Sequence, residues 1–348
     1  MKTWNFGIVG TGLIADFHAR AIADIPNAKL VGCCDIIFSR AKELADKFGG
    51  KAFGSYEDML KSEETGMDIV TIATPSGAHM EPTIAAARAG KHVICEKPLD
   101  VTLERIDAMI DAHKKAGTVL GGIFPYRFND AMVPLREAIN SGRFGVITYA
   151  GVYVPWWRTD EYYKDSWHGT WKLDGGGAIM NQSIHMVDML CDVMPPIESV
   201  QAFTATLGHP QIEAEDTAVA ILRFSNGALG IIYGTSASYP GRYRRFEITG
   251  TKGTVVYLED SFTMWQFADE KSEDEKIRKR FGQIEGGGGR AEPGDILHQN
   301  HTRNFKAFID ALESGTEPYI SGKEARKAVE LTLAIYKSAR EQKLVKLN

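Results

Sequence analysis

The feature that most constrains the fold is an alternation of short apolar runs with helical patterns over the first 123 residues. The apolar runs are nearly continuous, so the strands that they form would be buried on both faces. Such strands are typical of a parallel sheet that helices cover on both sides. The sequence therefore predicts a doubly wound α/β domain, with strands at 5–10, 28–35, 67–74, 91–96 and 118–124 and helices at 13–23, 39–48, 56–62, 77–90 and 102–116.

The pattern changes after about residue 124, where strand-like runs follow one another with few helices between them. The pair Asn226-Gly227 is a strong signal for a hairpin turn. We expect an α+β domain with an open, mainly antiparallel sheet and helices on one face, built from strands at 145–156, 197–207, 215–224, 227–237, 243–249 and 253–258 and helices at 129–141, 178–193, 300–314 and 322–341. The stretch 269–295 is predicted to be a solvated loop. The predicted domains are residues 1–124 and 125–348.

A glycine-rich turn, Gly10-Thr11-Gly12-Leu13-Ile14-Ala15, lies between the first strand and the first helix. Gly10 permits a tight turn, Gly12 lets the backbone approach a pyrophosphate, and Ala15 lets the helix pack closely on the strand. The free N–H groups at the helix start favour an anion. In this βαβ setting the motif predicts a dinucleotide site whose cofactor-binding residues include Gly10, Gly12, Leu13 and Ile14.

Asp35 ends the next strand, about 20 residues after Ala15. Its carboxylate can accept hydrogen bonds from the adenosine ribose diol and would repel a 2′-phosphate, so the sequence favours NAD over NADP. Arg40, on the following helix, could partly offset this repulsion, and NADP stays an alternative. The competing interpretation of Asp35 is a carboxylate that caps a loop at the end of a strand.

Two further strand ends carry polar residues at the edge where a doubly wound sheet binds its ligand. The first is Thr74-Pro75, followed by His79 on the next helix, and the second is Glu96-Lys97. We expect all five residues at the cofactor. We also expect the Lys97 ammonium to donate a hydrogen bond to a substrate oxygen beside the nicotinamide. The simpler alternative is an ordinary surface pair between Glu96 and Lys97.

In the second domain three consecutive glycines, 175–177, precede the helix expected at 178–193. They supply backbone freedom just before a helix that carries Asn181 and His185. These two residues are spaced i, i+4, so a regular helix would place them on one face. His185 is a candidate proton acceptor, and the alternative is a histidine packed in the core. No further histidine or cysteine lies at metal-ligand spacing, so no metal is predicted.

Residues 153–172 mix aromatic and polar side chains. Sugars present apolar C–H faces, which Trp and Tyr rings can cover, and hydroxyl rims, which polar side chains can bind. The residues predicted to bind such a substrate are Lys97, Arg158, Trp167, Lys172, Asn181 and His185. The alternative is an aromatic-rich segment that only packs between the domains.

Charge and cysteine content exclude several other classes of protein. The net charge is −5, and the absence of a long Lys/Arg run gives no reason to expect nucleic acid or an anionic membrane as partner. Four cysteines show no metal-ligand spacing and are expected to be free thiols. The sequence shows no leader and no apolar stretch near the roughly 20 residues of a membrane span, so we predict a cytoplasmic protein.

Six segments, in the order "GIVGTGLIA", "CD", "ATPSGAH", "CEKPL", "FPYRF" and "GGGAIMNQSIH", make the chain resemble the Gfo/Idh/MocA family over essentially its whole length. This family includes glucose–fructose oxidoreductase and inositol dehydrogenase. The resemblance implies an N-terminal Rossmann domain, a C-terminal domain with an open sheet, and dimers or tetramers formed through that sheet. It also implies NAD(P)-dependent oxidation or reduction of a sugar or polyol carbon, with Lys97 and His185 catalytic and Arg127 near the nicotinamide.

One position departs from inositol-dehydrogenase-like members, which carry Asp-x-x-x-His where this chain has Asn181 and His185. The segment before it looks more like sugar-nucleotide and glycoside 3-dehydrogenases of the family, which share the Asn-Gln-x-x-His form. Where such relatives often read Trp-Arg-Gly-Thr-Trp, this chain has His168 in place of the arginine. The resemblance therefore favours a substrate without several charges at that point.

The sequence as a whole predicts an NAD-dependent dehydrogenase that acts on a secondary alcohol of a sugar, glycoside, polyol or sugar nucleotide. Lys97 would stabilise the developing alkoxide, and His185 would take the hydroxyl proton. Two alternatives remain open. One is an NAD-dependent glycoside hydrolase or lyase that works through a transient 3-keto intermediate, and the other is a sensor that binds a sugar or dinucleotide without catalysis.

Overall fold

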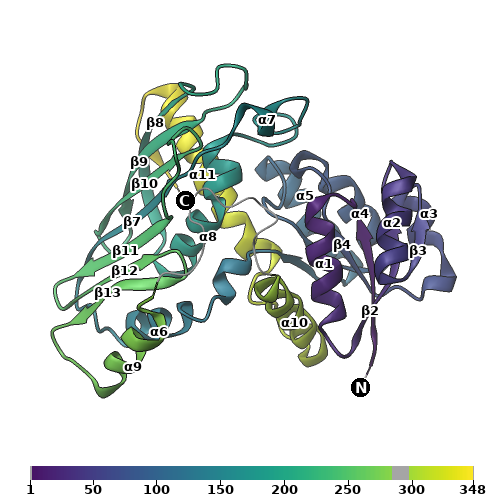
Figure 1. Ribbon diagram of the computed structural model, residues 1–348, viewed down its shortest axis with the longest axis horizontal. Coiled ribbons are helices and arrows are strands. Elements are labelled where there is room, and N and C mark those ends of the chain that lie inside the picture. Colours follow the sequence, from purple (N-terminus) through teal and green to yellow (C-terminus); the bar gives the residue numbers. More distant parts are fainter. Residues whose placement is uncertain (1, 284–297, 348) are drawn as a thin grey trace. The chain divides into compact units, whose positions relative to one another are not determined.

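The computed structural model describes residues 2–283 and 298–347, which divide into two compact units (Figure 1). Unit 1 comprises Met1–Pro125, Lys172–Gly175 and Ile296–Val329. Unit 2 comprises Tyr126–Trp171, Gly176–Asp295 and Glu330–Asn348. The first change of unit, at Pro125, lies next to the domain boundary predicted at residue 124. The units differ from the two continuous segments predicted, because the chain returns to unit 1 twice.

Unit 1 is the doubly wound domain that the sequence predicts. Among its described residues six parallel strands lie in the order β3-β2-β1-β4-β5-β6. The strands are β1 (Trp4–Val9), β2 (Ala28–Cys34), β3 (Lys51–Phe53), β4 (Ile69–Ile72), β5 (His92–Cys95) and β6 (Leu120–Gly122). The helices between them are α1 (Leu13–Ala23), α2 (Phe38–Phe48), α3 (Tyr56–Lys61), α4 (Met80–Arg88) and α5 (Leu103–Ala116).

Helix α10 (Gln299–Ser314) belongs to unit 1, although the sequence analysis assigned it to the second domain. Its apolar face joins the core of the parallel sheet. The ring of Phe305 stacks on Phe6 of β1, with the centroids 5.9 Å apart, and Phe308 and Ile309 belong to the same buried cluster. The helical period at 300–314 indicates an amphipathic helix but does not say which sheet it covers.

Unit 2 contains an open sheet, and eight strands of its described part follow the order β13-β12-β11-β7-β10-β9-β8-β14. Neighbours pair antiparallel except β7 and β10, which run parallel. The strands are β7 (Ile147–Pro155), β8 (Ile197–Ala205), β9 (Thr217–Phe224), β10 (Leu229–Thr235), β11 (Arg245–Gly250), β12 (Gly253–Leu258), β13 (Ser261–Phe267) and β14 (Val345–Lys346). The expected hairpin joins β9 to β10, with Gly227 at φ 86°.

The helices of unit 2 include α6 (Met132–Asn140), α7 (Asp160–Tyr163), α8 (Ile184–Val193) and α9 (Ser272–Phe281), together with the end of α11 (Gly322–Glu341). Figure 1 shows α8 against one face of the sheet, where it contacts β7. In β9 the residues facing this side, such as Ala220 and Leu222, are buried, whereas the alternate Ile221 is 55% exposed. This alternation is typical of a sheet with helices on one side only.

The structure corrects the prediction of a loop over 269–295 in part, because α9 occupies residues 272–281. Its position is set by Asp274, whose carboxylate accepts hydrogen bonds from Arg143 and from the indole of Trp265. The rest of that stretch, from residue 284 to 295, lies outside the described residues. Sequence analysis also missed β13, the short strands β3 and β14, and the four-residue helix α7.

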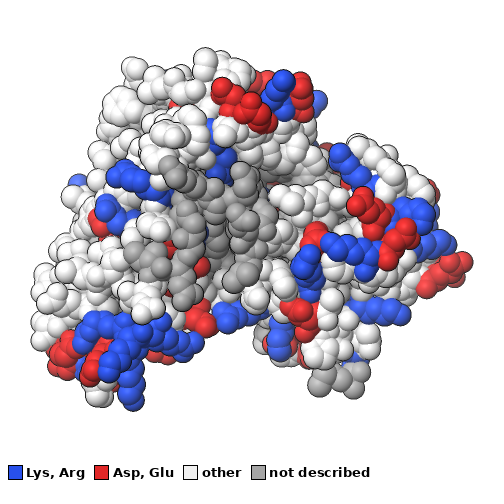
Figure 2. Space-filling view, viewed as in Figure 1, with Lys and Arg blue, Asp and Glu red and all other residues white. Residues whose placement is uncertain are grey.

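Charges of both signs mix over the helices on the face that Figure 2 shows. Acidic residues in the first turn of α9 and basic residues in its last turn lie side by side, and over α2 and α3 blue and red also alternate. Among the described residues on that face, no patch of a single sign stands out. No helix of the described residues is long and apolar enough to span a membrane.

Candidate active site

The glycine-rich turn follows β1 and opens α1, as predicted. Gly10 has φ 88°, and a Cβ there would lie 2.6 Å from the backbone of Ala73, so only glycine fits the turn. Gly12 is the N-cap of α1 and faces open space, with no atom within 4 Å of the Cβ position. No side chain of the described residues caps this helix start. Open space beside uncapped N–H groups fits a pyrophosphate.

Asp35 lies directly after β2 and faces the glycine-rich turn. Its Oδ2 accepts hydrogen bonds from the N–H and the hydroxyl of Thr11, at 2.8 and 3.0 Å, and its Oδ1 accepts from the Ile37 N–H at 2.8 Å. A carboxylate has about four acceptor positions, so one remains for a ligand. Asp35 is half-buried, whereas Arg40 is exposed on α2. The predicted loop-capping role and a role in binding a ribose are thus compatible.

The loop after β4 is joined to the loop after β5 through His79. This side chain is buried, with Nδ1 2.9 Å from the carbonyl oxygen of Pro98 and Nε2 2.9 Å from that of Thr74. Both ring nitrogens therefore bind backbone. A direct contact of His79 with the cofactor stays a prediction, and its observed contacts give it the role of holding two strand-end loops together. Thr74 and Pro75 are half-buried at the same end of the sheet.

Glu96 is a buried carboxylate that supports Lys97. Its Oε2 accepts the backbone N–H of Lys97 at 3.0 Å, and its Oε1 lies 2.9 Å from Nε2 of His18. Burial alone would raise the pKa of Glu96. The hydrogen bond from His18 is the largest of the effects that outweigh burial and lower the pKa to about 2, and the charge of Lys97 adds to it. Glu96 is thus ionised at neutral pH, and the alternative of a surface pair is excluded because Glu96 is only 6% exposed.

Within the described residues one group of side chains, His18, Glu96 and His301, has ligand atoms that converge within 4.8 Å. His18 already uses both ring nitrogens, on Glu96 and on the Thr71 hydroxyl at 3.0 Å. Burial lowers the pKa of His301 to about 4, so its ring is neutral at pH 7. The hydrogen bonds account for His18 and Glu96 as a support for Lys97, whereas Nε2 of His301 lies 4.0 Å from Glu96. The predicted absence of a metal stays a prediction.

In unit 2 the helix predicted at 178–193 begins as a π turn, Ala178–Ser183, and continues as α8. Sequence analysis expected a regular helix. π turns are rare and occur frequently at functional sites. Asn181 lies in the π turn and His185 in α8, and both are half-buried. Nδ2 of Asn181 is 3.2 Å from Nδ1 of His168, so these two residues form one polar contact.

His185 packs against a buried tyrosine that the sequence analysis did not single out. The rings of Tyr126 and His185 have centroids 4.6 Å apart. The guanidinium of Arg244 lies over the Tyr126 ring, 4.2 Å from the ring centroid. This guanidinium also forms an ion pair with Glu259 at 2.8 Å. Tyr126 is part of the quoted "FPYRF" segment, but no residue pattern indicated Arg244. The packing of Arg244 on Tyr126 and of Tyr126 on His185 holds the imidazole ring of His185 in place.

A cluster of rings in unit 2, which we call the aromatic platform, is formed by Tyr162, Trp167 and His168. His168 stacks on Tyr162 with an interplanar angle of 10°, and the ring of Trp167 is tilted by 42° against that of His168, with centroids 4.0 Å apart. Arg158 lies over the rings of Tyr162 and Trp156. The structure therefore brings Arg158, Trp167 and Asn181 into one neighbourhood through His168 and Tyr162. Lys172, by contrast, is an exposed residue of unit 1.

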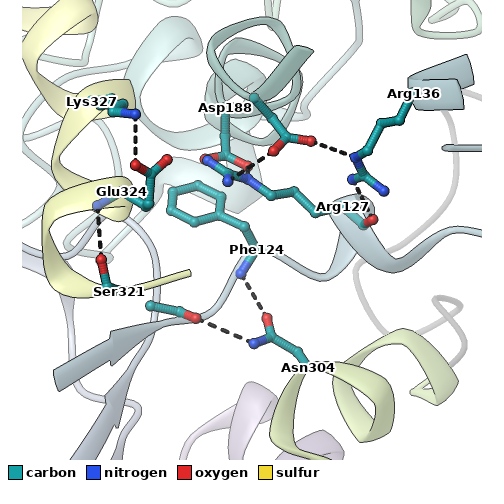
Figure 3. A network of polar contacts seen from close by, with 10 residues as sticks. Phe124, Arg127, Arg136, Asp188, Asn304, Ser321, Glu324 and Lys327 are labelled. Atoms are coloured by element: carbon teal, nitrogen blue, oxygen red, sulfur yellow. Dashed lines mark hydrogen bonds and ion pairs between the residues drawn. The ribbon is translucent and has the colours of Figure 1, made fainter. Parts of the chain in front are cut away.

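Arg127 is engaged in a buried ion-pair network. Its guanidinium donates to both carboxylate oxygens of Asp188 at 2.7 Å and to Asp192 at 3.1 Å, and it is 1% exposed (Figure 3). Arg136 donates to the other oxygen of Asp192. Contact of Arg127 with the nicotinamide stays a prediction, and the observed bonds give it the role of fixing α8.

In unit 1, the side-chain oxygen of Asn304 accepts a hydrogen bond from the N–H of Phe124, which lies just before the change of unit at Pro125.

Comparisons with known proteins cover the whole chain. Residues 4–123 match the oxidoreductase family with an NAD-binding Rossmann fold, and residues 132–256 match the GFO/IDH/MocA C-terminal domain. The chain is 30% identical to a myo-inositol 2-dehydrogenase of Thermotoga maritima, over 99% of this chain and 98% of that protein.

Solved structures agree with these matches. The WlbA dehydrogenase from Bordetella pertussis, in complex with NADH and UDP-GlcNAcA, is 36% identical with a TM-score of 0.90, over 100% of this chain and 98% of that one. A levoglucosan dehydrogenase in complex with NADH and L-sorbose is 26% identical with a TM-score of 0.87, over 100% of both chains. The chain therefore belongs to the GFO/IDH/MocA family of oxidoreductases and carries its NAD-binding Rossmann domain.

Proposed function

We propose that this enzyme transfers a hydride between NAD and a secondary alcohol of a sugar, glycoside, polyol or sugar nucleotide. The observation that carries the proposal is the full-length similarity, at 36% identity, to a dehydrogenase crystallised with NADH and a sugar nucleotide. The stacked aromatic platform of unit 2 supports a carbohydrate, because flat rings cover the apolar faces of sugars and the neighbouring amide and guanidinium can bind hydroxyl groups.

The proposed roles follow from the chemistry of two side chains. Lys97 donates a hydrogen bond to the reacting hydroxyl and stabilises the negative charge that develops on its oxygen. His185 accepts the hydroxyl proton, for which a neutral imidazole is suited near pH 7. A bound nicotinamide supplies the hydride acceptor. Glu96 holds the backbone of Lys97, and the ring of Tyr126 holds the plane of His185.

The experiment that tests the function is a panel of sugars, inositols, glycosides and UDP-sugars, assayed with NAD and NADP and followed by NMR of the product. We expect NADH formation with at least one substrate and a keto product. Release of a free sugar without net NADH would indicate the hydrolase or lyase alternative. Zero turnover over the panel, with NADH binding intact, would overturn the proposal in favour of a sensor.

Cofactor choice is expected to depend on Asp35. A carboxylate about 4 Å from a phosphate charge costs about 1–4 kcal/mol, depending on the local dielectric, so NAD(H) should bind at least about tenfold more tightly than NADP(H). Asp35→Ser should narrow this ratio. Thr11→Ala is the matched control, because it removes one hydrogen bond of Asp35 but keeps its charge. Equal or tighter binding of NADP(H) to the wild type, measured by calorimetry, contradicts the prediction.

The uncovered face of the sheet in unit 2 is proposed to be the contact between copies of this chain. Large apolar side chains alternate outward on it, and they belong to β8, β9, β10 and β13: Phe203, Val219, Ile221, Leu229 and Met264, between 41% and 70% exposed. Exposed apolar side chains of this kind are found at protein interfaces, and a face that pairs with itself gives closed oligomers.

Light scattering is therefore expected to give a dimer or tetramer of the 38.4 kDa chain. Ile221→Glu places a charge in the proposed contact and should shift the mass toward the monomer. Val133→Glu is the matched control, because Val133 is 53% exposed but belongs to helix α6 and not to a strand of the sheet. A wild-type monomer at micromolar concentration would refute the contact.

We also propose that the protein works in the cytoplasm. All four cysteines lie in the described residues and none is part of a disulfide, and three of them are buried. Burial raises the pKa of Cys33 and Cys34 to about 12, which keeps both thiols protonated and unreactive. Free thiols of this kind are compatible with a reducing compartment.

A further inference from the structure

We infer that Glu215 and Tyr336 are positioning residues for the helix that carries Asn181 and His185, and that they act by holding the π turn Ala178–Ser183 in place. The inference rests on the proposed function, since it gives these two residues a part in the same reaction. Neither residue belongs to the set that the sequence predicts.

The π turn needs acceptors from elsewhere in the chain. The first N–H groups of a helix have no partner within the helix, and a Ser, Thr, Asn or Asp side chain at the N-cap usually supplies one. Here the N-cap is Gly177, which has no side chain. The segment is buried, so water does not fill the place of a missing acceptor, and unpaired N–H groups would destabilise the turn.

Glu215, which lies just before β9, supplies three acceptors. Its Oε2 accepts the N–H of Gly177 at 3.0 Å and its Oε1 accepts the N–H of Ile179 at 2.9 Å. Its backbone carbonyl accepts the N–H of Ala178 at 3.0 Å. One residue just before a strand of the sheet thus binds three consecutive N–H groups of the helix start.

Tyr336, on α11, completes the arrangement. Its hydroxyl oxygen lies 3.3 Å from the N–H of Met180, and the hydroxyl donates to Oε1 of Glu215 at 3.0 Å. Tyr336 and Glu215 are each almost fully buried, at 2% and 4% exposure. The two side chains therefore act as one unit, which we call the Glu215–Tyr336 clamp.

Two of the three glycines before the helix are explained by this clamp. A Cβ on Gly177 would lie 1.7 Å from the carbonyl oxygen of Glu215, and a Cβ on Gly176 would lie 2.1 Å from the hydroxyl of Tyr336. The helix start also packs tightly on β10, because a Cβ on Gly234 would lie 2.4 Å from Oγ of Ser183. The glycines are thus needed for close approach of the clamp and the sheet to the π turn.

The clamp matters for chemistry because a π turn has an i→i+5 pattern, whereas an α-helix has i→i+4. If the π turn relaxed to an α-helix, Asn181 would rotate relative to His185. The contact of Asn181 with His168 and the packing of His185 on Tyr126 would then no longer form together. A misplacement of about 1 Å in a catalytic group can cost about 10²-fold in rate.

The test compares Glu215→Gln and Tyr336→Phe with Asp274→Asn. In Glu215→Gln one carboxylate oxygen becomes an NH₂ group, which is a donor that faces a backbone N–H. Tyr336→Phe removes the hydroxyl that accepts the N–H of Met180. Asp274 is the matched control, because it is also a buried carboxylate that holds a helix start, that of α9, and it takes no part in the proposed site. The measurements are kcat, KM, NADH affinity, melting temperature and the ¹H–¹³C NMR signal of the His185 ring, assigned with His185→Gln.

We expect both clamp variants to lower kcat by about 10- to 100-fold, with NADH affinity within twofold, and to shift the His185 signal. Asp274→Asn should lower the melting temperature but leave kcat and the signal unchanged. If Glu215→Gln does not fold, Tyr336→Phe decides alone. The inference is overturned if the clamp variants fold and leave the NMR signal of the His185 ring unchanged. It is also overturned if Asp274→Asn lowers kcat as much as the clamp variants do. If the wild type turns over no sugar, the proposed function fails, and the His185 signal still decides the clamp.

Discussion

Replacing Lys97 or His185 by alanine is expected to lower kcat by at least about 10²-fold while NADH binding stays near normal. A positioned proton acceptor contributes about 10²–10⁴-fold to the rate. Loss of one donor to a developing oxyanion costs about 10²–10³-fold. The effect should appear in kcat rather than in cofactor affinity, because the charge that each residue stabilises arises only as the hydroxyl reacts.

The double variant tests whether the two residues act on one hydroxyl. Lys97 belongs to unit 1 and His185 to unit 2. Whether the two residues act together on one hydroxyl can be decided by measuring kcat of the double variant. We expect the double variant to lose less than the product of the two single losses, as residues that act together do. If the loss of kcat in the double variant equals the product of the two single losses, Lys97 and His185 act on separate steps.

The exposed Lys306 and the half-buried His298 serve as matched controls for the charge and the ring that the alanine variants remove. Lys306 pairs with Asp310 on the surface of α10, and His298 pairs with Asp24. Lys306→Ala and His298→Ala should both keep kcat within twofold. If His185→Ala also keeps near-wild-type kcat with the acid limb of its pH–rate profile unchanged, His185 only packs on Tyr126, and the proton acceptor must be another group.

The parallel sheet of unit 1 could be predicted because five of its six strands are runs of apolar residues in the linear sequence, and only the three-residue β3 lacks such a run. The turn at Gly10 and Gly12, the strand end at Asp35 and the Lys97 loop followed from their place after such runs. The membership of α10 in unit 1 could not be predicted in this way. Its periodicity shows an apolar face, but the partner of that face, Phe6, lies about 300 residues earlier in the chain.

The parts of the candidate site that sequence missed are tertiary contacts without a local pattern. Glu215 precedes a strand and Tyr336 lies within a long helix, and only the folded chain brings both to the start of the His185 helix. The triple glycine was the one available signal. Taken alone it indicates backbone freedom, whereas at Gly176 and Gly177 it provides room for the phenol of Tyr336 and the backbone carbonyl of Glu215. A glycine can thus mark a close neighbour as well as a turn.

Arg127 illustrates how burial changes an interpretation made from a motif. The resemblance of "FPYRF" to its family implied a place near the nicotinamide. The structure shows a guanidinium that is 1% exposed and donates to both oxygens of Asp188, which is itself fully buried, and the place near the nicotinamide stays a prediction. Because Asp188 lies on α8 one turn beyond His185, this pair connects the segment after the first unit boundary to the proposed catalytic helix.

Arg127→Met is therefore expected to destabilise the protein by about 3–5 kcal/mol, because it leaves the charge of Asp188 buried without its partner. Urea unfolding checks this value. Arg326→Met is the control, because the pair of Arg326 with Asp107 lies at the surface and should contribute at most about 1 kcal/mol. The double variant Arg127→Met/Asp188→Leu should recover much of the loss, since it removes both buried charges, while Asp192 keeps its bond to Arg136. A different result would assign Arg127 to the cofactor. In that case Arg127→Met keeps a free energy of unfolding within about 1 kcal/mol of wild type, as for surface pairs, and binds NADH more weakly.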